Sequence, residues 1–159
     1  MSESNHAGGC LCGAVRYEIH GAPMIVHACH CNNCRRRTGG PFAVNLWIEA
    51  DRIRLLSGAP ESRQAPGLEI DSPSESWFCP SCGTCLWTRF HAAPAGSRFV
   101  RAGTLDDPAA FPPDVHIFTR FKLPWVTIPA GAPAFDEFYQ LKTTWPAASR
   151  ARLRNLLTE

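Results

Sequence analysis

The chain has 159 residues, of which 45% are hydrophobic, and its 16 basic and 14 acidic side chains leave a net charge of +2. This is the length of one ordinary domain with its own core. The near-neutral charge, without a dense basic run, disfavours binding to nucleic acid or to an anionic membrane surface. No apolar run approaches the ~18–20 residues of a membrane span, and the N-terminus lacks the features of a signal peptide. We therefore expect a cytoplasmic protein without nucleic-acid or membrane partners.

Fourteen prolines and twelve glycines divide the chain into short segments, most of which are typical of strands. Alternation and β-branched, aromatic or apolar residues predict strands, in chain order, over 15–19, 42–48, 52–56, 84–90, 99–102 and 115–121. The segment 57–76 is long for a loop, so an edge strand is expected within it at 61–65. Residues 32–37 are typical of a short helical turn, and 93–96 and 106–114 of surface loops. A helix is predicted over 146–157, with a proline in its first turn. The pattern indicates a mainly β fold with a C-terminal helix.

Eight cysteines in a chain without an export signal indicate metal or redox chemistry rather than disulfides. They form three groups, which are Cys10 and Cys12, then Cys29, Cys31 and Cys34, and finally Cys79 and Cys82 with Cys85 close behind. The Cys79–Cys82 turn is typical of half of a zinc site, because Gly83 lets the backbone turn back behind the two sulfurs. Such a half-site needs a second one, for which the first and the middle group are both candidates.

The middle group favours one division of the cysteines. Its three thiols are close enough in sequence to bind one ion together, which leaves Cys10 and Cys12 to pair with Cys79 and Cys82. The spacing therefore predicts one four-cysteine site and one three-cysteine site. Closed four-ligand zinc sites are structural, whereas three protein ligands with an open fourth position are typical of catalytic zinc. Two zinc ions per chain are expected.

Three other interpretations of these cysteines stay open. Cys-x-x-Cys pairs also occur as redox motifs, although no βαβ pattern surrounds these pairs. An iron–sulfur cluster would use the same thiolates. A zinc ribbon without chemistry would need about 15–20 residues between its Cys-x-x-Cys turns, whereas all of residues 35–78 separate Cys34 from Cys79. The ribbon also leaves several cysteines unexplained.

Taken together, the order and spacing of seven cysteines resemble the glutathione-dependent formaldehyde-activating (GFA) family. The matching stretches are 8–17 (Gly-Gly-Cys-Leu-Cys-Gly-Ala-Val-Arg-Tyr), 29–35 (Cys-His-Cys-Asn-Asn-Cys-Arg), Thr38-Gly39 and 78–84 (Phe-Cys-Pro-Ser-Cys-Gly-Thr). Weaker matches lie at 102–106 and 122–125, so the resemblance spans roughly residues 8–138.

The resemblance implies a β-tent fold, in which short antiparallel sheets meet around a structural zinc. That zinc would be held by Cys10, Cys12, Cys79 and Cys82, and a second, catalytic zinc by Cys29, Cys31 and Cys34. The activity implied is the joining of formaldehyde to glutathione as S-hydroxymethylglutathione, formally a carbon–sulfur lyase reaction in reverse. The helix after Trp145 lies outside the matched region. We therefore expect a zinc-binding β-tent domain over 1–145, with a C-terminal helix over 146–159 packed on it.

A mechanism follows from the chemistry of a three-cysteine site. A metal-bound thiol is deprotonated, and a site already rich in thiolates suits a soft sulfur better than hydroxide. The hypothesis is a carbon–sulfur lyase-type enzyme with a small-molecule thiol substrate, for which glutathione is a candidate. The alternative is a zinc-stabilised binding module without catalysis. Arg35, Arg36 and Arg37 are candidates for offsetting the charge of the thiolates or for gripping a carboxylate, and equally for a solvated turn.

The remaining chemical groups are less informative. His30 lies between two proposed ligands and is expected to point away from the metal. With Asp106 and His116 it is an unranked candidate for a general acid. Cys85 is expected to be a small buried hydrophobe. Trp125 is expected in the core or in the lining of a pocket.

Overall fold

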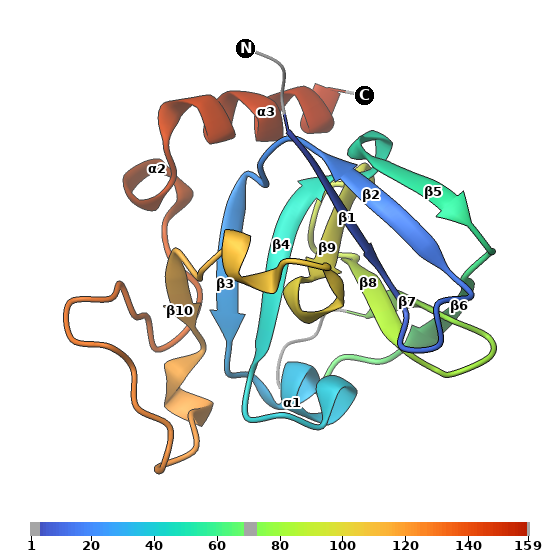
Figure 1. The fold of residues 1–159 in the computed structure, drawn as a ribbon. Coiled ribbons are helices and arrows are strands. Elements are labelled where there is room, and N and C mark those ends of the chain that lie inside the picture. Colours follow the sequence, from blue (N-terminus) through green and yellow to red (C-terminus); the bar gives the residue numbers. More distant parts are fainter. Residues whose placement is uncertain (1–3, 69–72, 159) are drawn as a thin grey trace.

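The structure, a computed structural model, describes residues 4–68 and 73–158. In this part of the chain ten strands form two sheets (Figure 1). The smaller sheet is antiparallel, in the order β1 (Asn5–Gly9), β2 (Arg16–His20), β5 (Ile53–Ser57). The larger sheet runs β10 (Val115–Ile117), β3 (Ile25–Cys29), β4 (Ala43–Glu49), β9 (Ser97–Arg101), β8 (Cys85–Phe90), β7 (Ser74–Phe78), β6 (Glu61–Ala65). Its strands pair antiparallel except β10, which lies parallel to β3.

The helices are few and short. They are α1 (Asn32–Thr38), α2 (Leu141–Thr144) and α3 (Ala147–Thr158), with 3-10 turns at Ala50–Arg52, Ala102–Thr104, Pro108–Ala110 and Thr119–Phe121. α1 ends at Gly39, whose φ of 70° is the left-handed conformation that glycine adopts without strain. None of the helices in the described segments has the length and apolar character to cross a membrane.

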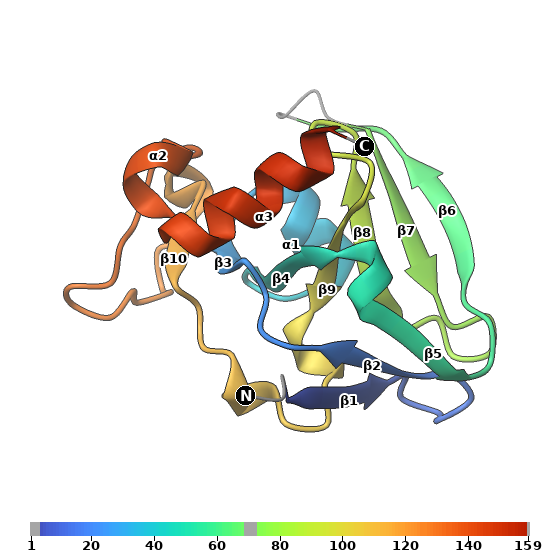
Figure 2. The same ribbon diagram turned by 90° about the horizontal axis from the view of Figure 1, so that it is seen from above.

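The side chains of β4 alternate between two hydrophobic cores. Leu46 and Ile48 point into the core shared with the three-stranded sheet, whereas Ala43 and Trp47 point into a second core on the opposite face. Figure 2 shows β1, β2 and β5 on one side of β4 and β9, and α3 on the other side. The strand is buried on both faces, so both cores depend on its register.

The predicted mainly β fold with a C-terminal helix is confirmed. The edge strand expected at 61–65 is β6, and the helical turn after Cys31 is α1. Three strands were missed. β3 is buried along its whole length and therefore does not alternate, while β1 and β7 are rich in small or polar residues. The strand predicted over 115–121 was wrong beyond Ile117, because Phe118 has a φ of 55° and a 3-10 turn follows.

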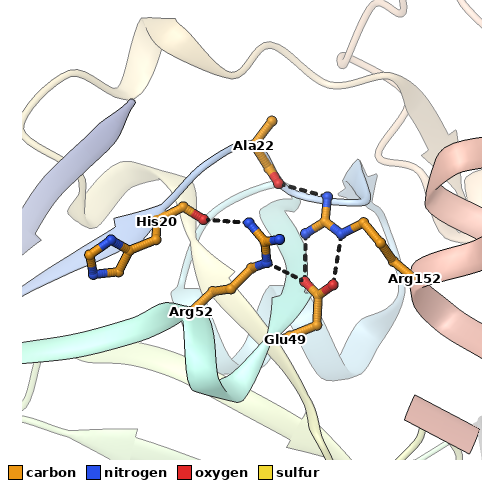
Figure 3. Close-up of polar contacts among 5 residues, drawn as sticks. All are labelled: His20, Ala22, Glu49, Arg52 and Arg152. Carbon is orange, nitrogen blue, oxygen red and sulfur yellow. Dashed lines mark hydrogen bonds and ion pairs between the residues drawn. The ribbon is translucent and has the colours of Figure 1, made fainter. Parts of the chain in front are cut away.

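An arginine–glutamate clamp fastens α3 to the sheet (Figure 3). The guanidinium of Arg152 donates through Nε and Nη2 to the Glu49 carboxylate, at 2.7 and 2.5 Å, and through Nη1 to the carbonyl of Ala22. Arg52 approaches the same carboxylate at 3.6 Å and donates to the carbonyl of His20. Burial raises the pKa of Glu49, but hydrogen bonds from Arg152 outweigh it and hold that pKa below its usual range. Glu49 therefore stays ionised and keeps α3 in place.

We expect Arg152→Met to lower the free energy of unfolding by about 2 kcal/mol, because it leaves a largely buried carboxylate without its bidentate partner. Urea unfolding measures the loss. Arg154→Met, at an exposed position of the same helix, is the matched control and should change little. Equal losses in the two variants would show that the clamp does not hold the helix.

Candidate functional site

Two hairpin turns from different sheets bring four cysteines together. Cys10 and Cys12 lie between β1 and β2, and Cys79 and Cys82 between β7 and β8. Each pair is followed by a glycine with positive φ, 79° at Gly13 and 75° at Gly83, whose amide donates back to the carbonyl of the first cysteine. The two turns are thus built alike and face each other.

The four sulfurs have the spacing of a tetrahedral zinc site. Their Sγ atoms all lie within 4.8 Å of one another, with 3.5 Å between Cys10 and Cys12 and 3.7 Å between Cys12 and Cys79. A Zn–S bond of about 2.3 Å in tetrahedral geometry separates two sulfurs by about 3.8 Å. Hydrogen bonds from the hydroxyl and the amide of Thr84 lower the pKa of Cys82 to about 5, which favours the thiolate form that a metal binds. The donors and their spacing fit zinc.

The end of β3 and the start of α1 form the second group of sulfurs. Cys29 ends the strand, Cys31 is the N-cap of the helix and Cys34 lies in its first turn, where its amide donates to the Cys31 sulfur at 3.3 Å. The three Sγ atoms lie within 4.8 Å of one another, and all three side chains are buried. Across residues 4–68 and 73–158, no fourth His, Cys, Asp or Glu joins this group. It can therefore hold a metal ion with one position left open.

Among the three cysteines of this group, Cys34 is the one whose surroundings favour the thiolate form. Hydrogen bonds from the thiols of Cys29 and Cys31 lower its pKa well below the usual range, and Arg101 and Asn45 add to the effect. Asn45 on β4 donates from Nδ2 to the Cys34 sulfur at 3.8 Å. Hydrogen bonds with Cys31 and Cys34, together with burial, raise the pKa of Cys29. A negative charge on the group is thus stabilised first at Cys34.

Arg101 is a buried cation beside these thiols. It ends β9, is 6% exposed, and donates to Asn45 Oδ1 and, at 3.1 Å, to the hydroxyl of Thr88. Burial lowers its pKa, but the neighbouring Cys34 and Cys85 raise it above its ordinary value, so it remains charged. Arg101 follows a hydrophobic strand segment and was not singled out in the sequence. A buried cation next to the three cysteines can offset the negative charge of their thiolates.

A cavity of about 440 Å³ opens directly onto the second sulfur group. Cys29, Cys31 and Cys34 all line it. Its other walls come from β4, β8 and β9 of the sheet, from the segment around Phe118 and Phe138, and from Leu153 and Leu157 of α3. The open side of the sulfur group therefore faces a space in which a small molecule can bind.

One polar chain borders the cavity. The indole Nε1–H of Trp145 donates to the hydroxyl of Tyr139 at 2.6 Å, and that oxygen lies 2.5 Å from Nε2 of His27. Since Trp145 can only donate, the hydroxyl proton of Tyr139 is available to His27, whose own proton then sits on Nδ1. Burial lowers the pKa of His27 to about 3, so its ring is neutral at pH 7. Sequence reasoning did not single out His27; its place two residues before Cys29 on one strand puts both on the same face.

The proposed acid candidates lie elsewhere. His30 and His116 contact each other at 3.1 Å, and Asp106 is bound by the guanidinium of Arg16 at the surface. None of the three lines the cavity. Trp125 is 70% exposed, so its expected place in the core was wrong, and it does not line this cavity.

The arginines after Cys34 have different partners. Arg37 donates to the hydroxyls of Ser74 and Ser76. Burial and the nearby positive charge of Arg101 lower the pKa of Arg37. Arg35 donates to Asn32. Cys85 is half-buried rather than buried as expected, and with Arg37 and Arg101 it lines a second hollow.

Comparison with known proteins shows which family this chain resembles. The family described as "Glutathione-dependent formaldehyde-activating enzyme" matches residues 5–121. A Halomonas elongata protein named "Putative glutathione-dependent formaldehyde-activating enzyme" is 35% identical over 129 residues, which are 76% of this chain and 79% of that protein. A crystal structure of a Rhodobacter sphaeroides protein covers 81% of this chain and 98% of its own, at 21% identity and a TM-score of 0.48.

The first prediction from the site concerns metal content. Two separate sulfur groups should hold about two zinc ions per chain, and Cys34→Ser should lower the content to about one. Cys85→Ala, which removes a cysteine outside both groups, is the matched control and should keep both. Elemental analysis of the purified proteins measures this. A content of one zinc in the parent protein, or a loss of zinc in Cys85→Ala, would contradict the division into two sites.

The second prediction concerns the different roles of the two groups. Cys82→Ser should lower the melting temperature far more than Cys34→Ser, because the four-sulfur group ties turns from two sheets together and metal binding there contributes to folding. Thermal unfolding followed by circular dichroism tests it. Similar losses in both variants would remove the distinction between a structural and an open site.

Proposed function

Because the chain belongs to the glutathione-dependent formaldehyde-activating family, we propose that it is a cytoplasmic, zinc-dependent enzyme of the carbon–sulfur lyase type. Its substrate would be a thiol–aldehyde adduct such as S-hydroxymethylglutathione. In this proposal Cys10, Cys12, Cys79 and Cys82 hold a structural zinc, and Cys29, Cys31 and Cys34 hold a catalytic one. One observation carries the proposal, which is that three clustered sulfurs, joined by no fourth ligand among the described residues, line a cavity of small-molecule size.

The chemistry required is simple. When bound by three thiolates, a zinc ion supplies an open position that accepts a thiol as its thiolate. In the cleavage direction the hydroxyl group of the adduct loses its proton to water and becomes the aldehyde carbonyl. The carbon–sulfur bond breaks at the same time, and its electron pair stays on the substrate sulfur. Adduct formation is the reverse.

The chain's own residues stabilise the charge that this reaction develops. Three cysteine thiolates and a substrate thiolate exceed the charge of one divalent cation by two. Arg101 offsets part of that excess from within the protein, and Asn45 positions both Arg101 and Cys34 through its two ends. The neutral ring of His27 forms part of the cavity wall without adding charge. These groups are held by strands, so they need little reorganisation during the reaction.

We expect the protein to speed the exchange of the hydroxymethyl group between formaldehyde and a thiol above the spontaneous rate. Exchange spectroscopy by NMR at equilibrium measures it without net product, with glutathione and with simple alkyl thiols. Cobalt-substituted protein should gain intensity in its sulfur-to-metal charge-transfer band when a thiol is added. Cys34→Ser should abolish both responses, and Cys85→Ala should keep both.

Two outcomes would contradict the proposal in different ways. A cobalt spectrum that no thiol changes would reject an open, thiol-accepting site. A clear spectral change without faster exchange for any thiol would reject the lyase activity and support a zinc-stabilised binding module.

A further inference from the structure

The cavity beside Cys29, Cys31 and Cys34 is almost entirely apolar. Its sheet side carries Trp47, Phe90 and Phe99, and its helix side carries Leu153 and Leu157. Among the described residues that line it, none is Asp, Glu, Lys or Arg. Glutathione carries two carboxylates and an ammonium group, and moving such charges into apolar surroundings without partners is costly.

The few polar side chains in the lining already have partners within the protein. Asn45 donates to the Cys34 sulfur and accepts from Arg101. Asn33 accepts from the amide of Leu68 at 3.0 Å, and Nε2 of His27 contacts the hydroxyl of Tyr139. The guanidinium of Arg101 does not line this cavity. The described lining thus offers little to bind a charged peptide-like thiol.

The size of the cavity also argues against a one-carbon group as its main occupant. A volume of about 440 Å³ lies within the ~300–1,000 Å³ range of small-molecule sites. A hydroxymethyl group is comparable to one or two water molecules, each of about 30 Å³. Most of the space is therefore left for the substituent on the substrate sulfur, which starts where the three cysteines lie.

The helix-side wall belongs to the part of the chain beyond the family match. That match ends at residue 121, whereas Phe138, Leu141, Leu153 and Leu157 all follow it. The Arg152–Glu49 clamp holds α3 on the sheet (Figure 3). On this helix Leu153 is buried, at 7% exposure, and Leu157 lies at the rim of the cavity, at 67% exposure. The cysteines lie within the family match, and the segment after residue 121 shapes the space in front of them.

We propose that the thiol taken by this site is an apolar monothiol, with an aromatic or branched aliphatic substituent in the cavity, rather than glutathione. The inference rests on the proposed function, since it names the substrate class of the same open sulfur site. The substituent packs between Trp47 and Phe99 on one side and Leu153 on the other, and its thiolate reaches Cys29, Cys31 and Cys34.

Binding to the full-length, cobalt-substituted protein tests the proposal. The charge-transfer band is titrated with 2-phenylethanethiol, with 2-mercaptoethanol as a small polar thiol, and with glutathione. Burial of a phenyl group of about 100 Å² should make 2-phenylethanethiol bind about 30- to 100-fold more tightly than 2-mercaptoethanol. Glutathione should bind no more tightly than 2-mercaptoethanol, although its thiol is the more acidic of the two. Ethylbenzene, which has no sulfur, should bind the zinc protein detectably by ligand-observed NMR and compete with 2-phenylethanethiol.

A pair of variants locates the effect in the cavity. Leu157→Arg places a cation at the rim, at a position exposed enough to leave folding intact, and should weaken 2-phenylethanethiol about fivefold while strengthening glutathione. Asn155→Arg adds the same charge to an exposed position of α3 outside the lining and should change neither. Circular dichroism checks that both variants keep the fold.

The results separate this inference from the proposed function. If glutathione binds as tightly as 2-phenylethanethiol, or if the phenyl group gives no advantage, the apolar substrate class is wrong and the thiol-accepting site stands. If ethylbenzene does not bind, the cavity does not take apolar groups and the inference is also wrong. If no thiol changes the spectrum, both the inference and the proposed function are wrong.

Discussion

The register of β4 is the constraint on which the rest of the structure depends. One face of this strand packs Leu46 and Ile48 against the three-stranded sheet, whose β1–β2 turn meets the β7–β8 turn in the four-sulfur group. The other face carries Asn45, Trp47 and Glu49, which contact in turn the Cys34 sulfur, the cavity and the helix α3. A shift of one residue would exchange the two faces, and with them the structural core and the candidate site.

The same register of β4 also places a buried positive charge beside the three cysteines. Three buried thiolates that held a divalent cation and a substrate thiolate would carry excess negative charge, which is unfavourable away from water. Arg101 lies on the neighbouring strand β9, where its register with Asn45 places the two side chains on one face. The cation is therefore supplied by the sheet rather than by the arginines that follow Cys34 in sequence. Placing the charge on a strand fixes it more firmly than a flexible surface side chain would.

The sequence predicted most of the cysteine arrangement and less of its surroundings. Cysteine spacing is a local signal, because Gly13 and Gly83 shape each turn and a group such as Cys29, Cys31 and Cys34 closes within a few residues. The division into two groups could therefore be predicted, as could the C-terminal helix. Arg101 could not, since it reaches the site only through the pairing of β4 with β9. His27 was missed because no strand was predicted at β3, although its place two residues before Cys29 puts both side chains on one face. The strand β3 was missed for a related reason, as burial on both faces removes the alternation that marks a strand.

The cysteines lie before residue 121, where the family match ends, and the helix side of the cavity wall lies after it. The region shared with the family supplies the sulfurs, the buried arginine and the sheet that fixes them, and these groups determine which reaction is possible. The segment beyond it supplies the helix side of the apolar wall through Leu141, Leu153 and Leu157. Reaction chemistry depends on exact geometry, which a change in strand register would destroy. Preference for a substituent depends mainly on the shape and polarity of the cavity wall, which a docked helix can alter while the cysteines stay in place. Membership of the family therefore bears on the chemistry open to the three cysteines, whereas the cavity wall bears on which thiol could bind beside them.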